Sequence, residues 1–216
     1  MTPTPTTPRR RPKTKSGSSR NERPIAVAIT GGIGAGKSAA LAAFARHGAA
    51  VVSSDEIVHR LLREDEEVRG ALRKRFGERV FGGDGSVDRA AVAAIVFHDR
   101  AELAWLEGIL HPRVVREYMD WRDALARLDD PPAVCVTEVP LLFEAGGETR
   151  FDAVVAITAP KDLRARRTPM ALDERSQRLI PDAEKLRRAD FAYVNDGSLE
   201  ELDAFAGDVM SRLTSS

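Results

Sequence analysis

The sequence predicts an α/β fold in which a five-stranded parallel sheet carries helices on both faces. Short apolar segments that read as buried strands alternate with longer segments of helical periodicity. A glycine-rich loop joins the first of these strands to a helix, and polar residues follow every predicted strand. In sheets of this kind ligands bind beyond the carboxyl ends of the strands, so the functional residues are expected along that edge.

The first predicted strand, residues 25–30, leads through the glycine-rich loop into an alanine-rich helix that ends at Gly48. From Gly31 to Ser38 the loop fits the pattern G-x-x-x-x-G-K-[ST] of a phosphate-binding P-loop. In such a loop, backbone N–H groups surround phosphate oxygens and the helix N-terminus adds partial positive charge. The residues expected to bind a nucleotide are Gly32, Ile33, Gly34, Ala35, Gly36, Lys37, Ser38 and Ala39.

Two side chains of this loop have roles of their own in the prediction. Lys37 is expected to reach the β- and γ-phosphates, and the Ser38 hydroxyl is expected to ligate Mg²⁺. The alternative is a glycine-rich turn with a solvated lysine. The strand before the loop and the helix after it favour the P-loop, and with it a P-loop NTPase-like fold.

The second predicted strand, residues 49–52, is followed by Asp55 at the start of a helix. In phosphoryl transfer, a carboxylate at that place can accept the proton of the attacking hydroxyl or help to position Mg²⁺. The alternative is a helix N-cap, which Asp favours. Because Ser53 and Ser54 could cap the helix equally well, we favour the functional role.

Residues 61–128 are nearly all helical in pattern and form an insertion between the second and third strands. Ser86 or Asp88 is the expected N-cap of one of these helices. His111 precedes Pro112 and is predicted to mark a helix boundary, with a substrate contact as the alternative.

The third, fourth and fifth strands are predicted at residues 133–139, 151–158 and 191–195. Glu138 at the end of the third strand could orient Mg²⁺-bound water, or it could pair with a neighbouring base. Asn195 ends the fifth strand, and a capping box formed by Ser198 and Glu201 opens the final helix.

An arginine-rich segment connects the fourth and fifth strands and is too polar for the core. Arginines on a mobile lid can close over a triphosphate, neutralise the charge of the transferring phosphoryl group and exclude water. The alternative is a solvated helix face. The arginines concerned are Arg164, Arg166, Arg167 and Arg175.

Composition narrows the class of protein. The 216 residues are 43% hydrophobic and 31% charged, as in an ordinary globular protein, and no apolar run approaches a membrane span. The single cysteine, Cys135, favours a reducing cytoplasm.

Residues 1–24 carry seven Lys/Arg and one Glu, which predicts a disordered basic tail. The rest of the chain is therefore acidic, which argues against a nucleic-acid enzyme. His47, His59 and His98 have no companion at metal-ligand spacing.

From Ile25 to about Leu213 the chain resembles the dephospho-coenzyme A kinase family. The resemblance lies in an ordered set of stretches: TGGIGAGKS, VVSSDEIVHRLL, DGSVDRAAVAAIVF, LEGILHP, EVPLLFE, EKLRRAD and VNDGS. It implies a cytoplasmic enzyme that uses ATP and Mg²⁺ to phosphorylate the ribose 3′-hydroxyl of dephospho-coenzyme A, the last step of coenzyme A synthesis. Oligomeric state is not predicted.

The resemblance also implies roles for individual residues. The helical insertion, about 58–128, would bind the acceptor, and residues 161–185 would form a short lid. Asp55 would act as base or positioning group for the acceptor hydroxyl. The implied catalytic residues are Asp55, Lys37, Arg167 and Arg175; Asn195 joins the loop in binding the nucleotide; the implied substrate-binding residues are Asp55, Arg89, His111, Pro140 and Glu144.

Three positions depart from the family pattern: Ser53 stands where Asp is usual, Ala39 where Thr is usual, and Leu179 where Gln is usual, in a shortened lid. Two other functions compete with the implied one. One is another P-loop kinase that acts on a nucleoside, a nucleotide or a hydroxy acid. The other is a nucleotide-dependent switch, although the chain has no Asn-Lys-x-Asp string for reading guanine.

Overall fold

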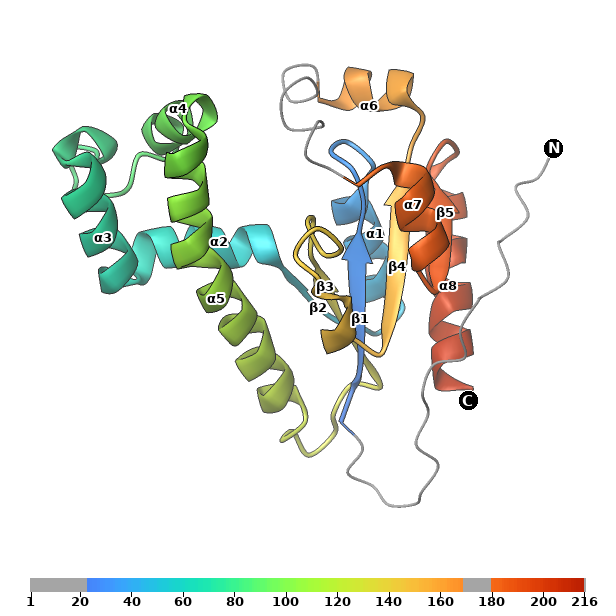
Figure 1. Ribbon diagram of the computed structural model, residues 1–216. Helices are drawn as coiled ribbons and strands as arrows, with labels where there is room; N and C mark the ends of the chain where they lie inside the picture. Colours follow the sequence, from blue (N-terminus) through green and yellow to red (C-terminus); the bar gives the residue numbers. More distant parts are fainter. Residues whose placement is uncertain (1–22, 169–179, 216) are drawn as a thin grey trace. The chain divides into compact units, whose positions relative to one another are not determined.

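The computed structural model describes residues 23–168 and 180–215 (Figure 1). The chain divides into two compact units. The helical unit consists of residues 54–121, and the α/β unit contains the described residues before and after that range. No helix of the described residues is long and apolar enough to cross a membrane.

The α/β unit contains the predicted five-stranded sheet, and every strand pair is parallel. The strand order is β2-β3-β1-β4-β5. The register sets Ser53 of β2 and Ile29 of β1 on either side of Glu138, the last residue of β3. The carboxyl ends of these three strands therefore meet at one edge of the sheet. The strands are β1 (Ile25–Thr30), β2 (Ala50–Ser53), β3 (Val134–Glu138), β4 (Ala153–Thr158) and β5 (Phe191–Val194).

Helices lie on both faces of the sheet, as predicted. Figure 1 shows α1 behind the sheet and α7 in front of it. On one face, Phe44 of α1 packs with Val27 and Ile29 of β1 and with buried residues of α8. On the other face, Ala28 packs with apolar residues of the segment after β3 and with Ala189. The elements are α1 (Lys37–Arg46), α6 (Lys161–Arg167), α7 (Asp182–Arg188), α8 (Leu199–Thr214) and the 3-10 helix η2 (Glu148–Arg150).

This burial on both faces explains why β1 has an unbroken apolar sequence. Successive side chains of a strand point to opposite faces, and here both faces are covered. Ala26, Val27, Ala28 and Ile29 are all fully buried. The glycine-rich loop therefore starts from a strand that is buried on both faces.

The helical unit contains α2 (Ser54–Glu64), α3 (Glu66–Phe76), the 3-10 helix η1 (Glu78–Val80), α4 (Arg89–His98) and most of α5 (Arg100–Leu125). Its small core includes Val68 and Leu72 of α3, and Phe76 meets Trp105 edge to face at 5.2 Å between ring centroids. Asp88 is the N-cap of α4, since its side chain accepts hydrogen bonds from two backbone N–H groups in the first turn. Of the two expected caps, Asp88 is therefore the correct one.

The helix boundary predicted at His111 is wrong, because α5 continues through Pro112. Proline in a helix removes one backbone hydrogen bond and crowds the preceding turn. Leu110 and Val114, on either side of it, are both buried, so packing holds the helix together. Arg113 also donates from its guanidinium to the carbonyl of Ile109, at 3.0 Å. His111 itself is exposed.

Arg23, the first described residue, contacts the segment just before β4 through its side chain. Its guanidinium donates two hydrogen bonds of 2.8 Å to the carboxylate of Asp152. Burial tends to raise the pKa of Asp152, but Arg23 and the N–H of Ala26 outweigh this effect and the pKa is lowered. Residues 1–22 of the predicted tail lie outside the described residues.

Candidate functional site

The glycine-rich loop follows β1 and wraps the N-terminus of α1, which begins at Lys37. Close contacts explain two of its glycines. A Cβ at Gly31 would stand 1.9 Å from the carbonyl oxygen of Ile157, and one at Gly36, whose φ is +92°, would stand 2.1 Å from Nδ2 of Asn195. No side chain of the described residues caps α1. Its first N–H groups are therefore available to an anion, as in other P-loops.

Lys37 lies back across the loop that precedes it. Its Nζ donates to the carbonyl oxygen of Gly32 at 3.1 Å. The ammonium group is thus held beside the backbone of the glycine-rich loop. Contact of Lys37 with the β- and γ-phosphates stays a prediction.

Ser38 and Glu138 form the polar pair expected of an oxygen-ligated cation site. The Ser38 hydroxyl donates to Oε2 of Glu138 at 3.4 Å, and the Glu138 side chain is buried at the end of β3. Mg²⁺ prefers oxygen ligands and is bound by one or two protein groups together with substrate phosphates. Within the described ranges, no group of three or more His, Cys, Asp or Glu is placed to hold a metal alone. The donor set therefore fits Mg²⁺ bound jointly with a nucleotide.

Asn195 reaches the loop from the end of β5. Its Nδ2 donates to the carbonyl oxygen of Ala35 at 2.9 Å, and its own backbone N–H donates to Thr158 at 2.7 Å. The side chain is buried. Asn195 therefore ties the end of one strand to the backbone of the glycine-rich loop, whereas the sequence predicted only a contact to the nucleotide.

Two of the four lid arginines contact the loop in the structure. Arg167 donates to the carbonyl oxygen of Gly34 at 3.4 Å. Arg164 forms an ion pair with Asp182, at 3.1 Å, beside Gly32. Arg166 is exposed on α6, and Arg175 lies outside the described residues, as does Leu179.

The segment after β3 supports the edge of the site. The carbonyl oxygen of Pro140 accepts a hydrogen bond from Thr30 at 3.2 Å. Oε1 of Glu144 accepts from the backbone N–H of Ile180 at 2.9 Å and lies 2.8 Å from Nζ of Lys185, which is fully buried. Pro140 and Glu144 were predicted to bind substrate, and in the structure each contacts other residues of the protein. Lys185 was missed because it stands in a run of charged residues that reads as exposed.

Replacing Lys185 by methionine is expected to lower the free energy of unfolding by about 3–5 kcal/mol, because the Glu144 carboxylate would remain largely buried without its cation. The double variant Lys185→Met/Glu144→Gln should recover much of the loss, since neither charge remains. Urea unfolding measures both. The matched substitution of an exposed lysine, Lys161→Met, should have little effect. Equal losses in the single and double variants would contradict the coupling.

The remaining predicted residues belong to the helical unit. Asp55 is the second residue of α2 and is exposed; because α2 begins at Ser54, Asp55 stands inside the first turn and is not the N-cap. Arg89 begins α4, with Nη1 3.4 Å from Nδ1 of His59. The catalytic role of Asp55 stays a prediction.

The comparison with known proteins decides the family. The family model described as dephospho-CoA kinase matches residues 25–201, which is most of the chain. This chain belongs to the dephospho-CoA kinase family. The match leaves out the basic tail and includes the glycine-rich loop, Asp55, Glu138, Glu144 and Asn195.

Individual members of the dephospho-CoA kinase family are similar to this chain over most of its length. A dephospho-CoA kinase of Leifsonia xyli is 39% identical over 182 residues, covering 81% of this chain and 91% of the relative. One from Rhodopseudomonas palustris is 38% identical, covering 82% and 89%. Among solved structures, TT1252 from Thermus thermophilus is 36% identical with a TM-score of 0.69, covering 89% of this chain and 99% of that one. Dephospho-CoA kinase from Campylobacter jejuni, 23% identical with a TM-score of 0.63, covers 90% and 100% and shares the fold.

Two positions that depart from the dephospho-CoA kinase pattern can now be placed. Ser53 ends β2, is buried, and stands in register with Glu138, so the carboxylate at this edge of the sheet comes from β3. Ala39 is partly buried and packs against the core shared by α1 and α8. Its methyl group therefore contributes to packing.

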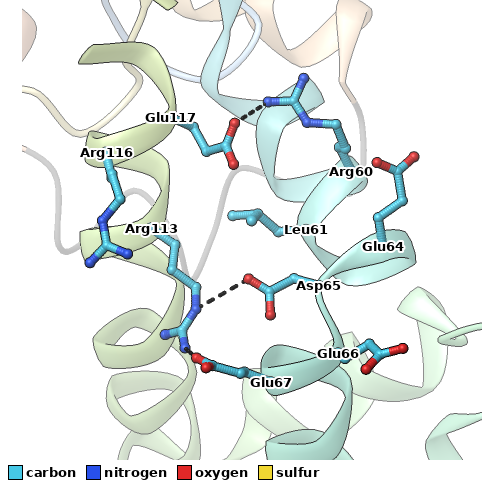
Figure 2. A pocket seen from close by; sticks show the side chains of 9 residues that line it. All are labelled: Arg60, Leu61, Glu64, Asp65, Glu66, Glu67, Arg113, Arg116 and Glu117. Atoms are coloured by element: carbon cyan, nitrogen blue, oxygen red, sulfur yellow. Dashed lines mark hydrogen bonds and ion pairs between the residues drawn. The ribbon is translucent and has the colours of Figure 1, made fainter. Parts of the chain in front are cut away.

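The helical unit also holds a cavity of about 480 Å³ between α2, α3 and α5. Figure 2 shows Arg113 reaching from α5 toward Asp65 and Glu67, and Arg60 reaching from α2 to Glu117. Carboxylates outnumber guanidinium groups, and most of the arginines are used in ion pairs. The cavity is lined by Arg60, Leu61, Glu64, Asp65, Glu66, Glu67, Arg113, Arg116 and Glu117, none of which was predicted as a site residue.

Proposed function

We propose that this protein transfers the γ-phosphate of ATP to the ribose 3′-hydroxyl of dephospho-coenzyme A, giving coenzyme A and ADP. The observation that carries the proposal is the family match over residues 25–201, which includes every element of the glycine-rich site. We place the reaction in the cytoplasm, in keeping with the single cysteine of the sequence.

Binding of the triphosphate is the task of the loop. The uncapped N–H groups at the start of α1 and the ammonium group of Lys37, which lies beside the loop, would hold the β- and γ-phosphates. Preorganised donors of this kind stabilise charge in the transition state without having to reorient during the reaction. Asn195 would keep the loop in position, because its side chain donates a hydrogen bond to the carbonyl oxygen of Ala35.

Ser38 and Glu138 are the residues that would hold Mg²⁺, Ser38 through its hydroxyl and Glu138 through its carboxylate. The ion, when bound, neutralises charge on the β- and γ-phosphates. The protein contributes a buried carboxylate of fixed position, because Glu138 is the last residue of β3, which pairs with β1 on one side and β2 on the other.

Asp55 is the proposed base for the acceptor. An ionised carboxylate in hydrogen-bond reach of a ribose hydroxyl can accept its proton as the oxygen attacks phosphorus. The helical unit, which begins at Ser54, is the proposed acceptor-binding region, with Arg89 and His111 as its predicted contacts. On the α/β unit, Arg167 would complete the cationic surroundings of the γ-phosphate, and Arg175 is proposed from the family pattern alone.

The test of the proposed function is the identity of the acceptor. ATP consumption should be measured with dephospho-coenzyme A, a nucleoside and shikimate in parallel assays. We expect turnover with dephospho-coenzyme A and formation of coenzyme A. Turnover with only one of the other two acceptors would overturn the proposal and favour another P-loop small-molecule kinase.

Substitution Asn195→Ala is expected to raise the Kd for ATP by about five- to tenfold, because the loop loses the hydrogen bond that holds Ala35. Equilibrium titration with ATP measures the change. The neighbouring exposed residue gives a matched control, Asp196→Ala, whose Kd should be nearly unchanged. Equal affinities for all three proteins would contradict a positioning role for Asn195.

A further inference from the structure

Arg164 is held in one position beside the glycine-rich loop by an acidic residue from a different helix. Nη2 of Arg164, on α6, lies 3.1 Å from Oδ2 of Asp182, the first residue of α7. Only 14% of the Arg164 side chain is exposed. An arginine that is buried to this degree, paired and planar has a defined guanidinium orientation.

The guanidinium of Arg164 lies directly against the loop. A Cβ at Gly32 would stand 2.6 Å from its Nη1 and 3.3 Å from Oδ1 of Asp182. Any side chain larger than hydrogen at position 32 would therefore displace the pair. Lys37 donates to the carbonyl oxygen of the same glycine, so the two cations meet at one peptide of the loop.

Arg164 also retains donors that the protein does not use. A guanidinium has five N–H donors, and the buried Nε of Arg164 has no hydrogen-bond partner among the described residues. Leaving such a donor unsatisfied costs free energy unless a ligand binds it. Beside a P-loop, the group that would satisfy it is an oxygen of the bound phosphates.

The acidic partner is itself held firmly. α7 packs against β4 and β5, and its Lys185 is fully buried in the ion pair with Glu144. Glu144 also binds the N–H of Ile180, two residues before Asp182. Asp182 therefore starts a helix that is anchored on the α/β unit at both ends of its first turn.

We propose that Arg164 binds the phosphates of the nucleotide in the loop, and that Asp182 is a positioning residue that orients it. The charge of Asp182 keeps the guanidinium extended over Gly32 before the nucleotide arrives, so less side-chain entropy is lost on binding. The inference rests on the proposed function only in requiring a nucleoside triphosphate in the loop. It assigns a role to an arginine that the family pattern of the lid does not include.

The test is a double-mutant cycle on nucleotide binding and turnover, with the variants Arg164→Ala, Asp182→Asn and their combination. Arg164→Ala should lower kcat by about 10²-fold. Asp182→Asn should raise the Kd for ATP and lower kcat about tenfold, and the double variant should be no worse than Arg164→Ala, because Asp182 acts through Arg164. If Asp182 acted only in folding, its substitution would still have an effect in the Arg164→Ala background.

The matched control is Glu184→Gln, which removes another carboxylate from the first turn of α7 and should change the Kd for ATP less than twofold. Independent effects that multiply in the double variant would overturn the inference, as would an unchanged kcat and Kd in Arg164→Ala. Because the Kd for ATP is measured without an acceptor, this result does not depend on whether dephospho-coenzyme A is the substrate.

Discussion

Replacing Lys37 by methionine is expected to lower kcat by about 10³-fold, the upper range for losing one preorganised donor to a developing charge. Methionine keeps much of the length and apolar character of the side chain, so the loss reports the missing ammonium group. The structure supports the expectation because Nζ lies over the loop, 3.1 Å from the Gly32 carbonyl oxygen. Steady-state turnover of ATP with dephospho-coenzyme A measures it.

The matched control is Lys74→Met, the same substitution at an exposed lysine of α3, which should leave kcat unchanged. The Kd for ATP should be measured for both variants, since Lys37 contributes to binding as well as to catalysis. If Lys37→Met turned over ATP at the rate of the control, the loop would not be the catalytic phosphate site.

Replacing Asp55 by asparagine is expected to lower kcat by about 10²-fold or more while the Kd for ATP stays nearly the same. Asparagine has the same shape but cannot accept the proton of the acceptor hydroxyl. Asp55 is an exposed residue in the first turn of α2, and urea unfolding of the variant measures any accompanying change in stability. Pre-steady-state measurement of coenzyme A formation separates the chemical step from product release.

The neighbouring exposed residue provides the control for Asp55, since Glu56→Gln removes a negative charge from the same helical turn. It should retain kcat within about twofold, in line with ordinary surface substitutions. If Asp55→Asn and Glu56→Gln behaved alike, Asp55 would have no part in the reaction. If Asp55→Asn weakened only the binding of acceptor, its role would be recognition.

The positions of the strands and of the glycine-rich loop were predictable because they depend on local sequence. β1 was predicted with the bounds that it has, and the other strands to within one or two residues at each end. The capping box of Ser198 and Glu201 is present because it is a contact between residues three apart. The boundary predicted at Pro112 was wrong because buried neighbours on α5 outweigh the local preference of proline.

The predictions for charged side chains were less complete, because their partners are distant in sequence. Arg164 and Asp182 are eighteen positions apart, and Glu144 and Lys185 are forty-one apart. No local pattern distinguishes a buried lysine from an exposed one in the stretch EKLRRAD. Asn195 was predicted at the correct edge of the sheet, but its contact with Ala35, from the other end of the chain, was not predictable.

The α/β class, the P-loop and the family could all be predicted from the sequence alone, because they depend on local periodicity and on ordered motifs. The pairing of polar and charged side chains depended on the tertiary structure, which brings together Ser38 with Glu138, Arg164 with Asp182, and Lys185 with Glu144. The physical reason is that the energy of a charged group depends on its burial and its partner, and both are set when strands and helices from distant parts of the chain pack together.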